Sequence, residues 1–213
     1  MPALKGIFEQ FEDIENLSVT DLSHWLNPIQ QITNIENHIA NRILYPQTLP
    51  VNKDDFKIDL AILREALKRV GMANKANRFI DKQSHKILIP TDFIKFIPNL
   101  NQLVWAFVDG LFSELNKSDG SNDLWLIVLS GDSNEIVGTL LIPNFQGGGD
   151  LLELGVQGKI FKIKAGSLSV IPCFSDSCRV VFKVNKGLLL GSQESAIDLR
   201  GGKLGIMIDG RIK

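Results

Sequence analysis

The amino-acid sequence predicts an α+β fold, with an N-terminal helical domain followed by a C-terminal all-β sandwich or small barrel. Apolar residues recur at helical spacing as far as Leu115. From Leu124 onward, short apolar runs alternate with turns rich in Gly and Asn, a pattern typical of strands. The polar loop at 117–123 separates the two patterns. We therefore expect a mainly α-helical domain over 1–119 and an all-β domain over 120–213.

The helical half divides at turn and capping residues. Ser18 is a candidate N-cap for a short helix, and Asn99 is a candidate N-cap for the best-patterned helix of the chain. Gly71 suits the position after a helix end. The segment between Pro90 and Pro98 should be extended or turn-like, because the prolines prevent one continuous helix. We expect helices over 5–26 with a break near Ser18, 28–45, 54–70, 73–80 and 100–115.

The second half contains short apolar runs that read as strands. Gln157-Gly158, Ala165-Gly166 and Gly201-Gly202 are the expected turns between several of them. The first two runs should form a hairpin around 131–134. We expect strands over 124–129, 136–142, 151–156, 158–164, 167–172, 179–184, 187–190, 195–199 and 203–209.

Composition excludes several classes of protein. A net charge of −1 and a charged fraction of 22% argue against a nucleic-acid or anionic-membrane binder that relies on excess positive charge. The N-terminus does not have the pattern of a secretory signal peptide, and no apolar run reaches the ~20 residues of a membrane-spanning helix. With only two cysteines, a disulfide-rich secreted fold is excluded, so we expect a cytoplasmic protein.

Cys173 and Cys178 are the two cysteines of the chain. A structural zinc site needs four ligands, and no second pair of Cys or His lies near them in the sequence. A hairpin loop between them would bring their Cα atoms near the range that a disulfide requires. In the cytoplasm we expect free thiols packed as small apolar groups. A redox switch remains an alternative.

Nucleic-acid binding is a second hypothesis, based on basic residues over 64–86. Two short helices joined at Gly71 would form a helix-turn-helix, in which Lys75, Arg78 and Lys82 contact phosphates. The alternative is that these charges are the solvated faces of two amphipathic helices.

A carboxylate-based hydrolase is a third hypothesis. Asp150 with Glu153, or Asp198 with Asp209, would form the acid/base pair. The glycines at 146–150 lack the lysine and helix of a phosphate loop, so a flexible joint or contact loop is the better interpretation. The β half has no histidine, which excludes a nucleophile–histidine site confined to it.

The favoured hypothesis is a non-enzymatic interaction protein, an adaptor or an assembly or regulatory subunit. The pattern contains apolar cores and no recognisable catalytic, metal or cofactor motif, although an enzyme stays open. The partner would be another protein or a second copy of this chain. Its expected contact residues are Phe93, Phe96, Ile97, Phe145 and Gln146.

Overall fold

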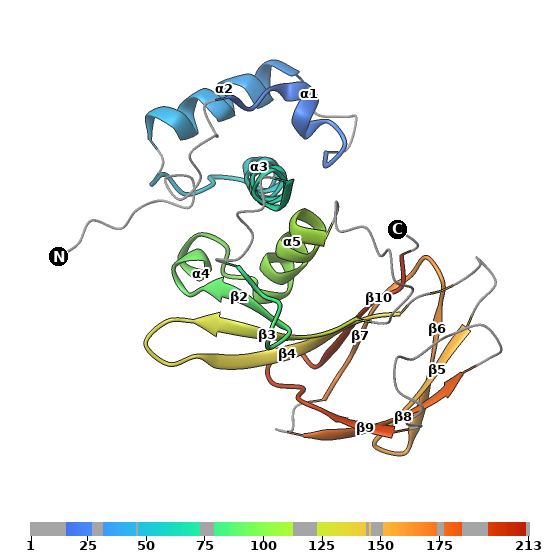
Figure 1. Cartoon of the computed structure of the whole chain (residues 1–213). Helices are drawn as coiled ribbons and strands as arrows, with labels where there is room; N and C mark the ends of the chain where they lie inside the picture. Colours follow the sequence, from blue (N-terminus) through green and yellow to red (C-terminus); the bar gives the residue numbers. More distant parts are fainter. Residues whose placement is uncertain are drawn as a thin grey trace. The chain divides into compact units, whose positions relative to one another are not determined.

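The structure is a computed structural model that divides the chain into two compact units (Figure 1). One unit comprises Met1–Ala76 and Thr91–Leu115, and the other comprises Asn77–Pro90 and Asn116–Lys213. The expected domains 1–119 and 120–213 stay a prediction, which can be compared with this division. The difference is the segment 77–90, which belongs with the β unit. The structure describes residues 16–26, 32–45, 47–72, 79–112, 123–143, 145, 151–173, 177–184 and 196–211.

The first unit is helical, as the apolar spacing predicts. Its described helices are α1 (Val19–Leu22), α2 (Ile32–Leu44), α3 (Lys53–Met72), α4 (Asp92–Phe96) and α5 (Leu100–Phe112). Two expectations are wrong. α3 continues through Gly71 to Met72, and 92–96 forms a helix where an extended segment was expected. The prolines bound α4 rather than interrupt it, so a single short turn of helix fits between them.

Capping side chains set the starts of three helices. Ser18 and Asp21 form a reciprocal capping box at α1, and Asn99 Oδ1 accepts the backbone N–H of Gln102 at α5, as predicted. At α3 the cap is Asn52, whose Oδ1 accepts the N–H groups of Asp54 and Asp55. This cap precedes the start of the helix predicted over 54–70.

The core of the helical unit forms where α3 and α5 pack together. The apolar stripe of α5 is buried, including Leu103, Phe107 and Leu111, as expected for the best-patterned helix of the chain. The helices approach closely at Gly110. A Cβ there would lie 2.6 Å from the carbonyl oxygen of Arg64 and 2.6 Å from Cβ of Leu67.

The second unit contains two sheets. The six-stranded sheet has the order β1-β2-β3-β4-β10-β7, and the four-stranded sheet has the order β6-β5-β8-β9. The strands of the first sheet are β1 (Ile80–Asp81), β2 (Lys86–Pro90), β3 (Asp123–Ser130), β4 (Glu135–Ile142), β7 (Leu168–Ile171) and β10 (Ile206–Asp209). Those of the second are β5 (Leu151–Val156), β6 (Lys159–Lys164), β8 (Cys178–Val184) and β9 (Ala196–Leu199). The expected run at 187–190 lies outside the described residues.

Strand β2 explains why 77–90 belongs to this unit. It pairs in parallel with β3, and Ile87 and Ile89 are fully buried. The local sequence shows an extended segment, but a parallel pairing across more than thirty residues leaves no local signature. Of the predicted helix over 73–80, residues 73–78 lie outside the described residues, and Ile80 lies in β1 rather than in a helix.

Both sheets contribute to one buried cluster. Leu141 of β4 and Ile208 of β10 lie in it together with Leu154 of β5 and Phe182 of β8. The predicted turns at 157–158, 165–166 and 201–202 are confirmed, with Gly158, Gly166 and Gly202 at positive φ. The hydrophobic faces of these strands thus form a single core, as alternating burial predicts.

Candidate functional site

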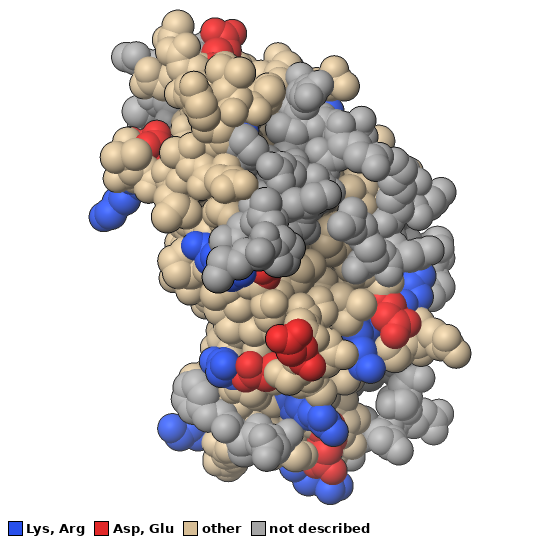
Figure 2. Space-filling view, turned by 90° about the vertical axis from the view of Figure 1, so that its left-hand side faces the viewer, with Lys and Arg blue, Asp and Glu red and all other residues tan. Residues whose placement is uncertain are grey.

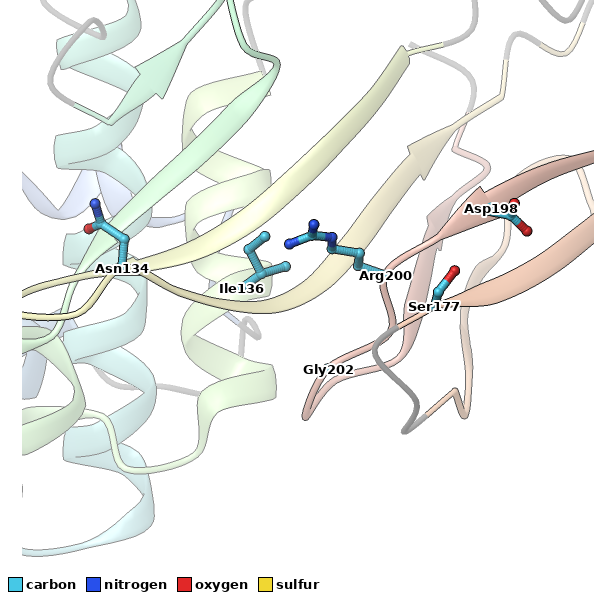
Figure 3. Close-up of a pocket in the computed structure, with 6 residues that line it drawn as sticks. All are labelled: Asn134, Ile136, Ser177, Asp198, Arg200 and Gly202. Carbon is cyan, nitrogen blue, oxygen red and sulfur yellow. The ribbon is translucent and has the colours of Figure 1, made fainter.

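Two hollows lined by described residues of the β unit lie along β9. The larger has a volume of about 670 Å³ and is shown in Figure 3. The smaller has a volume of about 330 Å³. Asp198 and Arg200 line both, so the two hollows adjoin at the end of β9. We name them together the β9 groove. Its residues are Ser84, His85, Leu124, Leu126, Asn134, Ile136, Ser177, Asp198, Leu199, Arg200 and Gly202.

The floor of the β9 groove comes from β3 and β4. Cross-strand pairing places Leu124 opposite Leu141 and Leu126 opposite Thr139, so these four side chains share one face. Leu141 belongs to the cluster that both sheets share, and Leu124 packs against that cluster. Farther along the same strands, Leu126 and Ile136 are only half-buried and line the groove.

Strand β9 forms one wall of the groove, and it lies at the edge of its sheet. Within the part of the chain that the structure describes, β9 pairs with β8 alone. In a strand with one neighbour, alternate N–H and C=O groups point toward the open side. Asp198 and Leu199 of this edge strand line the hollows, so β9 borders them.

Arg200 directly follows β9 and occupies the junction of the hollows. Its backbone carbonyl accepts a hydrogen bond from Thr139 Oγ1 at 2.6 Å, which ties the main chain to β4. Its side chain is exposed and extends toward Ile136, whereas Asp198 and Ser177 lie on the far side of the main chain from it (Figure 3). Among the described residues, the guanidinium of Arg200 forms no ion pair.

The loop after Arg200 is held tightly against β4. Gly205 N–H donates to the carbonyl of Gly201 at 2.7 Å, and Leu204 N–H donates to Val137 at 2.7 Å. Gly202 has φ of 55°, and a Cβ there would lie 2.7 Å from the carbonyl carbon of Val137. Only glycine satisfies both conditions, so this wall is a preformed turn.

The turn between β1 and β2 borders the smaller hollow. Asp81 accepts hydrogen bonds from the Ser84 hydroxyl and from the N–H groups of Ser84 and Gln83. These bonds, that of the Ser84 hydroxyl first, lower the pKa of Asp81. His85 adopts a φ of 49°, and its ring lies 5.4 Å from that of Trp125.

A disulfide joins Cys173 and Cys178 next to the larger hollow, with a Cα–Cα distance of 6.5 Å. Both residues are buried in the shared cluster, and Ser177 lines the groove. A Cβ at Gly201 would overlap the Cys173 carbonyl, which shows how closely the loops pack. The expected proximity of the cysteines is confirmed, but the expectation of free thiols is not met.

The predicted partner-binding residues lie largely inside the protein. Phe93 is 0% exposed and packs edge to face on Phe107, and Ile97 is 1% exposed. Phe96 is half-buried, and Phe145 is buried in the shared cluster. Gln146 lies outside the described residues. Burial assigns Phe93, Ile97 and Phe145 to the cores, so they offer no exposed apolar patch.

The basic residues proposed for nucleic acid lie only partly within the described chain. Lys75 and Arg78 lie outside the described residues, and Lys82 lies in the turn between β1 and β2. On α3, Arg64 pairs with Asp109 at 2.8 Å. Figure 2 shows basic and acidic side chains close to one another on the face it presents. Nucleic-acid binding thus remains a prediction without a described basic surface.

Of the carboxylate pairs proposed for hydrolysis, the described one, Asp198 with Asp209, is divided between the two sheets. Asp198 lies in β9 and Asp209 in β10 of the other sheet, where Asp209 is 0% exposed and binds Arg211 through both oxygens. Glu153 lies near Lys162, and Asp150 is outside the described residues. In the described part of the chain, no three metal-binding side chains cluster.

Comparison with protein-family models, characterised proteins and solved structures gives no match for this chain. Among the described helices, none has the length and apolar character needed to cross a bilayer. Asp198 of the β9 groove is a predicted catalytic carboxylate, whereas Arg200 is not among the residues predicted from the sequence. A single arginine between a strand and a Gly-Gly turn carries no pattern that would identify a site.

Proposed function

We propose that this protein is a non-enzymatic interaction protein that binds an extended segment of a partner polypeptide along the open edge of β9. The observation that carries the proposal is the position of that edge beside two adjoining hollows. An edge strand offers a row of backbone donors and acceptors, and an added strand satisfies them without requiring a particular sequence.

The floor of the groove supports this proposal. We infer that the two sheets are the layers of a sandwich in which the four-stranded layer stops at β9. Leu126 and Ile136 lie half-buried on the face of β3 and β4 that continues past this edge. A strand paired with β9 would cover them, so it would gain apolar burial as well as main-chain hydrogen bonds.

The size of β9 limits the bound segment. β9 has four residues, so a matching segment of about five residues would extend roughly 17 Å. Alternate side chains of that segment would face Leu126 and Ile136, and the intervening ones would face solvent. We therefore expect a preference for apolar residues at every second position.

Peptide display on the full-length protein tests the proposal. Random twelve-residue peptides are selected, and hydrogen exchange locates the amides that the best peptides protect. Versions of those peptides N-methylated at alternate residues remove donors to the edge of β9 without changing the protein. We expect protection over 196–200 and weaker binding for one of the two N-methylated sets. Failure to select a peptide, or protection elsewhere with no effect of N-methylation, contradicts the proposal.

A second copy of this chain is the competing occupant, because β9 could pair with itself. Light scattering across a dilution series, combined with hydrogen exchange, distinguishes the cases. A monomer with exchanging β9 amides agrees with a separate partner, whereas a dimer that protects these amides makes the chain its own partner. The cytoplasmic location is retained as part of the proposal.

A further inference from the structure

We propose that Arg200 recognises a carboxylate on the segment that binds at β9. The inference rests on the proposed function and adds the chemistry of the partner. Arg200 lines both hollows, so a group bound in either hollow lies near Arg200. Its guanidinium forms no ion pair with the described residues, whereas the neighbouring charges do.

The charge balance of the groove favours an acidic ligand. Asp198 Oδ2 lies 4.0 Å from Nη1 of Arg179. At the edge of the larger hollow, Glu135 lies 2.8 Å from Nζ of Lys203. Because these carboxylates already face cations, the charge left at the junction of the hollows, counted over the described residues, is the positive charge of Arg200. A guanidinium binds a carboxylate through two parallel hydrogen bonds, which adds directional specificity to the charge attraction.

The surroundings of Arg200 are suited to holding such a group. Asn134 supplies an amide that can hydrogen-bond to a carboxylate or to the adjacent main chain. Ile136 and Gly202 supply nonpolar surface beside it, which reduces competition from water. A carboxylate bound here would therefore be held more firmly than on a flat surface.

The position of Arg200 also indicates which part of the bound segment holds the carboxylate. Arg200 follows the last residue of β9, so it lies beyond one end of the ladder that a partner strand would form. The carboxylate should accordingly occupy an end of the paired stretch rather than its centre. It could come from an Asp or Glu side chain or from the C-terminus of the partner.

Two series of modified versions of the selected peptides test this proposal. In one arm each Asp or Glu is changed to Asn or Gln, and in the other the C-terminus is amidated. Both series are measured against the unmodified chain, against Arg200→Gln and against Lys162→Gln. Lys162 is an exposed lysine on β6 outside the groove, so its variant controls for the loss of one positive charge.

We expect one arm to weaken binding to the unmodified chain roughly tenfold or more. The arm that does so identifies the source of the carboxylate. The same change should have little effect on Arg200→Gln, while Lys162→Gln behaves like the unmodified chain. Equal melting temperatures would show that Arg200→Gln is folded, which is expected because its side chain is exposed.

Two failures are distinguishable. If N-methylation weakens binding but neither arm does, or if Arg200→Gln binds every peptide as the unmodified chain does, then strand addition stands and carboxylate recognition is refuted. If no peptide protects β9, the proposed function itself fails.

Discussion

Arg42 binds Asp59 through both carboxylate oxygens, with Nε 2.8 Å from Oδ1 and Nη2 2.5 Å from Oδ2. This pair joins α2 to α3, and both residues are buried. His38 Nε2 lies 2.7 Å from the same Oδ1, and Arg42 Nη1 also donates to the carbonyl of Thr48. The stability of a buried cation in such a network depends on every one of its partners.

Asp59→Asn should lower the free energy of unfolding by about 3 kcal/mol, because it leaves the buried Arg42 without its counter-charge. Urea unfolding followed by circular dichroism measures the change. Asp54→Asn is the matched control, since Asp54 pairs with Lys57 in a pair exposed to solvent. Equal losses for the two variants would show that burial of the Arg42–Asp59 pair has no energetic consequence.

Gly110→Ala should destabilise the helical unit by about 2 kcal/mol, because the new methyl group overlaps the main chain of α3 at Arg64. Gly71→Ala is the control within the same unit. Its Cβ would lie at an ordinary 3.6 Å from Leu111, and alanine is favoured over glycine in a helix by about 1 kcal/mol. The two substitutions should thus shift the thermal midpoint in opposite directions, and shifts of the same sign and size would refute the close helix approach.

Ser18→Ala should destabilise α1 in a pH-dependent manner. The backbone N–H and the hydroxyl of Ser18 hydrogen-bond to Asp21 and lower the pKa of that carboxyl below its ordinary value of 3.8. A lowered folded pKa stabilises the protein at pH values above 3.8, and this contribution is lost as the pH falls through the folded pKa.

At pH 7 the Ser18→Ala variant should lose about 1 kcal/mol of stability, and the difference from the unmodified chain should shrink below pH 4. Ser23→Ala is the control, because the Ser23 hydroxyl donates to the carbonyl of Thr20 and involves no carboxylate. Unfolding curves at several pH values provide the measurement. A Ser18→Ala difference that is the same at pH 7 and pH 3 would contradict the Asp21 assignment.

The Cys173–Cys178 disulfide should protect both thiols from alkylation in unfolded, unreduced protein. Mass spectrometry should show two alkyl groups only after a dithiol reductant is added. Closing so short a loop should stabilise the fold by about 2 kcal/mol, so reduction should lower the unfolding midpoint. Double alkylation without reductant would instead restore the expectation of free cytoplasmic thiols.

Strands and helices with strong local patterns could be predicted without coordinates. The stripe of α5, the β3–β4 hairpin and the turn at Gln157-Gly158 depend on neighbours within a few residues. The extent of β5 follows from its alternation of buried and half-buried residues. The strand predicted over 203–209 begins only at Ile206, and all four residues of β10 are buried. Misplaced elements, such as α4, were those in which prolines and apolar residues permit more than one local conformation.

The buried aromatic residues show the limit of this reasoning. Phe93 looks like a surface residue in an irregular segment, yet it packs on Phe107 and has no exposed surface. Composition reports that a segment is apolar but not which neighbour covers it. The predicted contact surface therefore failed at the step from pattern to exposure.

Local sequence determined the two classes of secondary structure and the positions of most elements, because helical and strand periodicities are properties of adjacent residues. Tertiary structure decided that β2 joins the sheet of β3, that β9 ends its sheet, and that Arg200 lies between two hollows. These features depend on which distant segments pair. Strands pair through main-chain hydrogen bonds, so the side chains of one strand do not identify the strand beside it. The candidate site consequently emerged only from the three-dimensional arrangement.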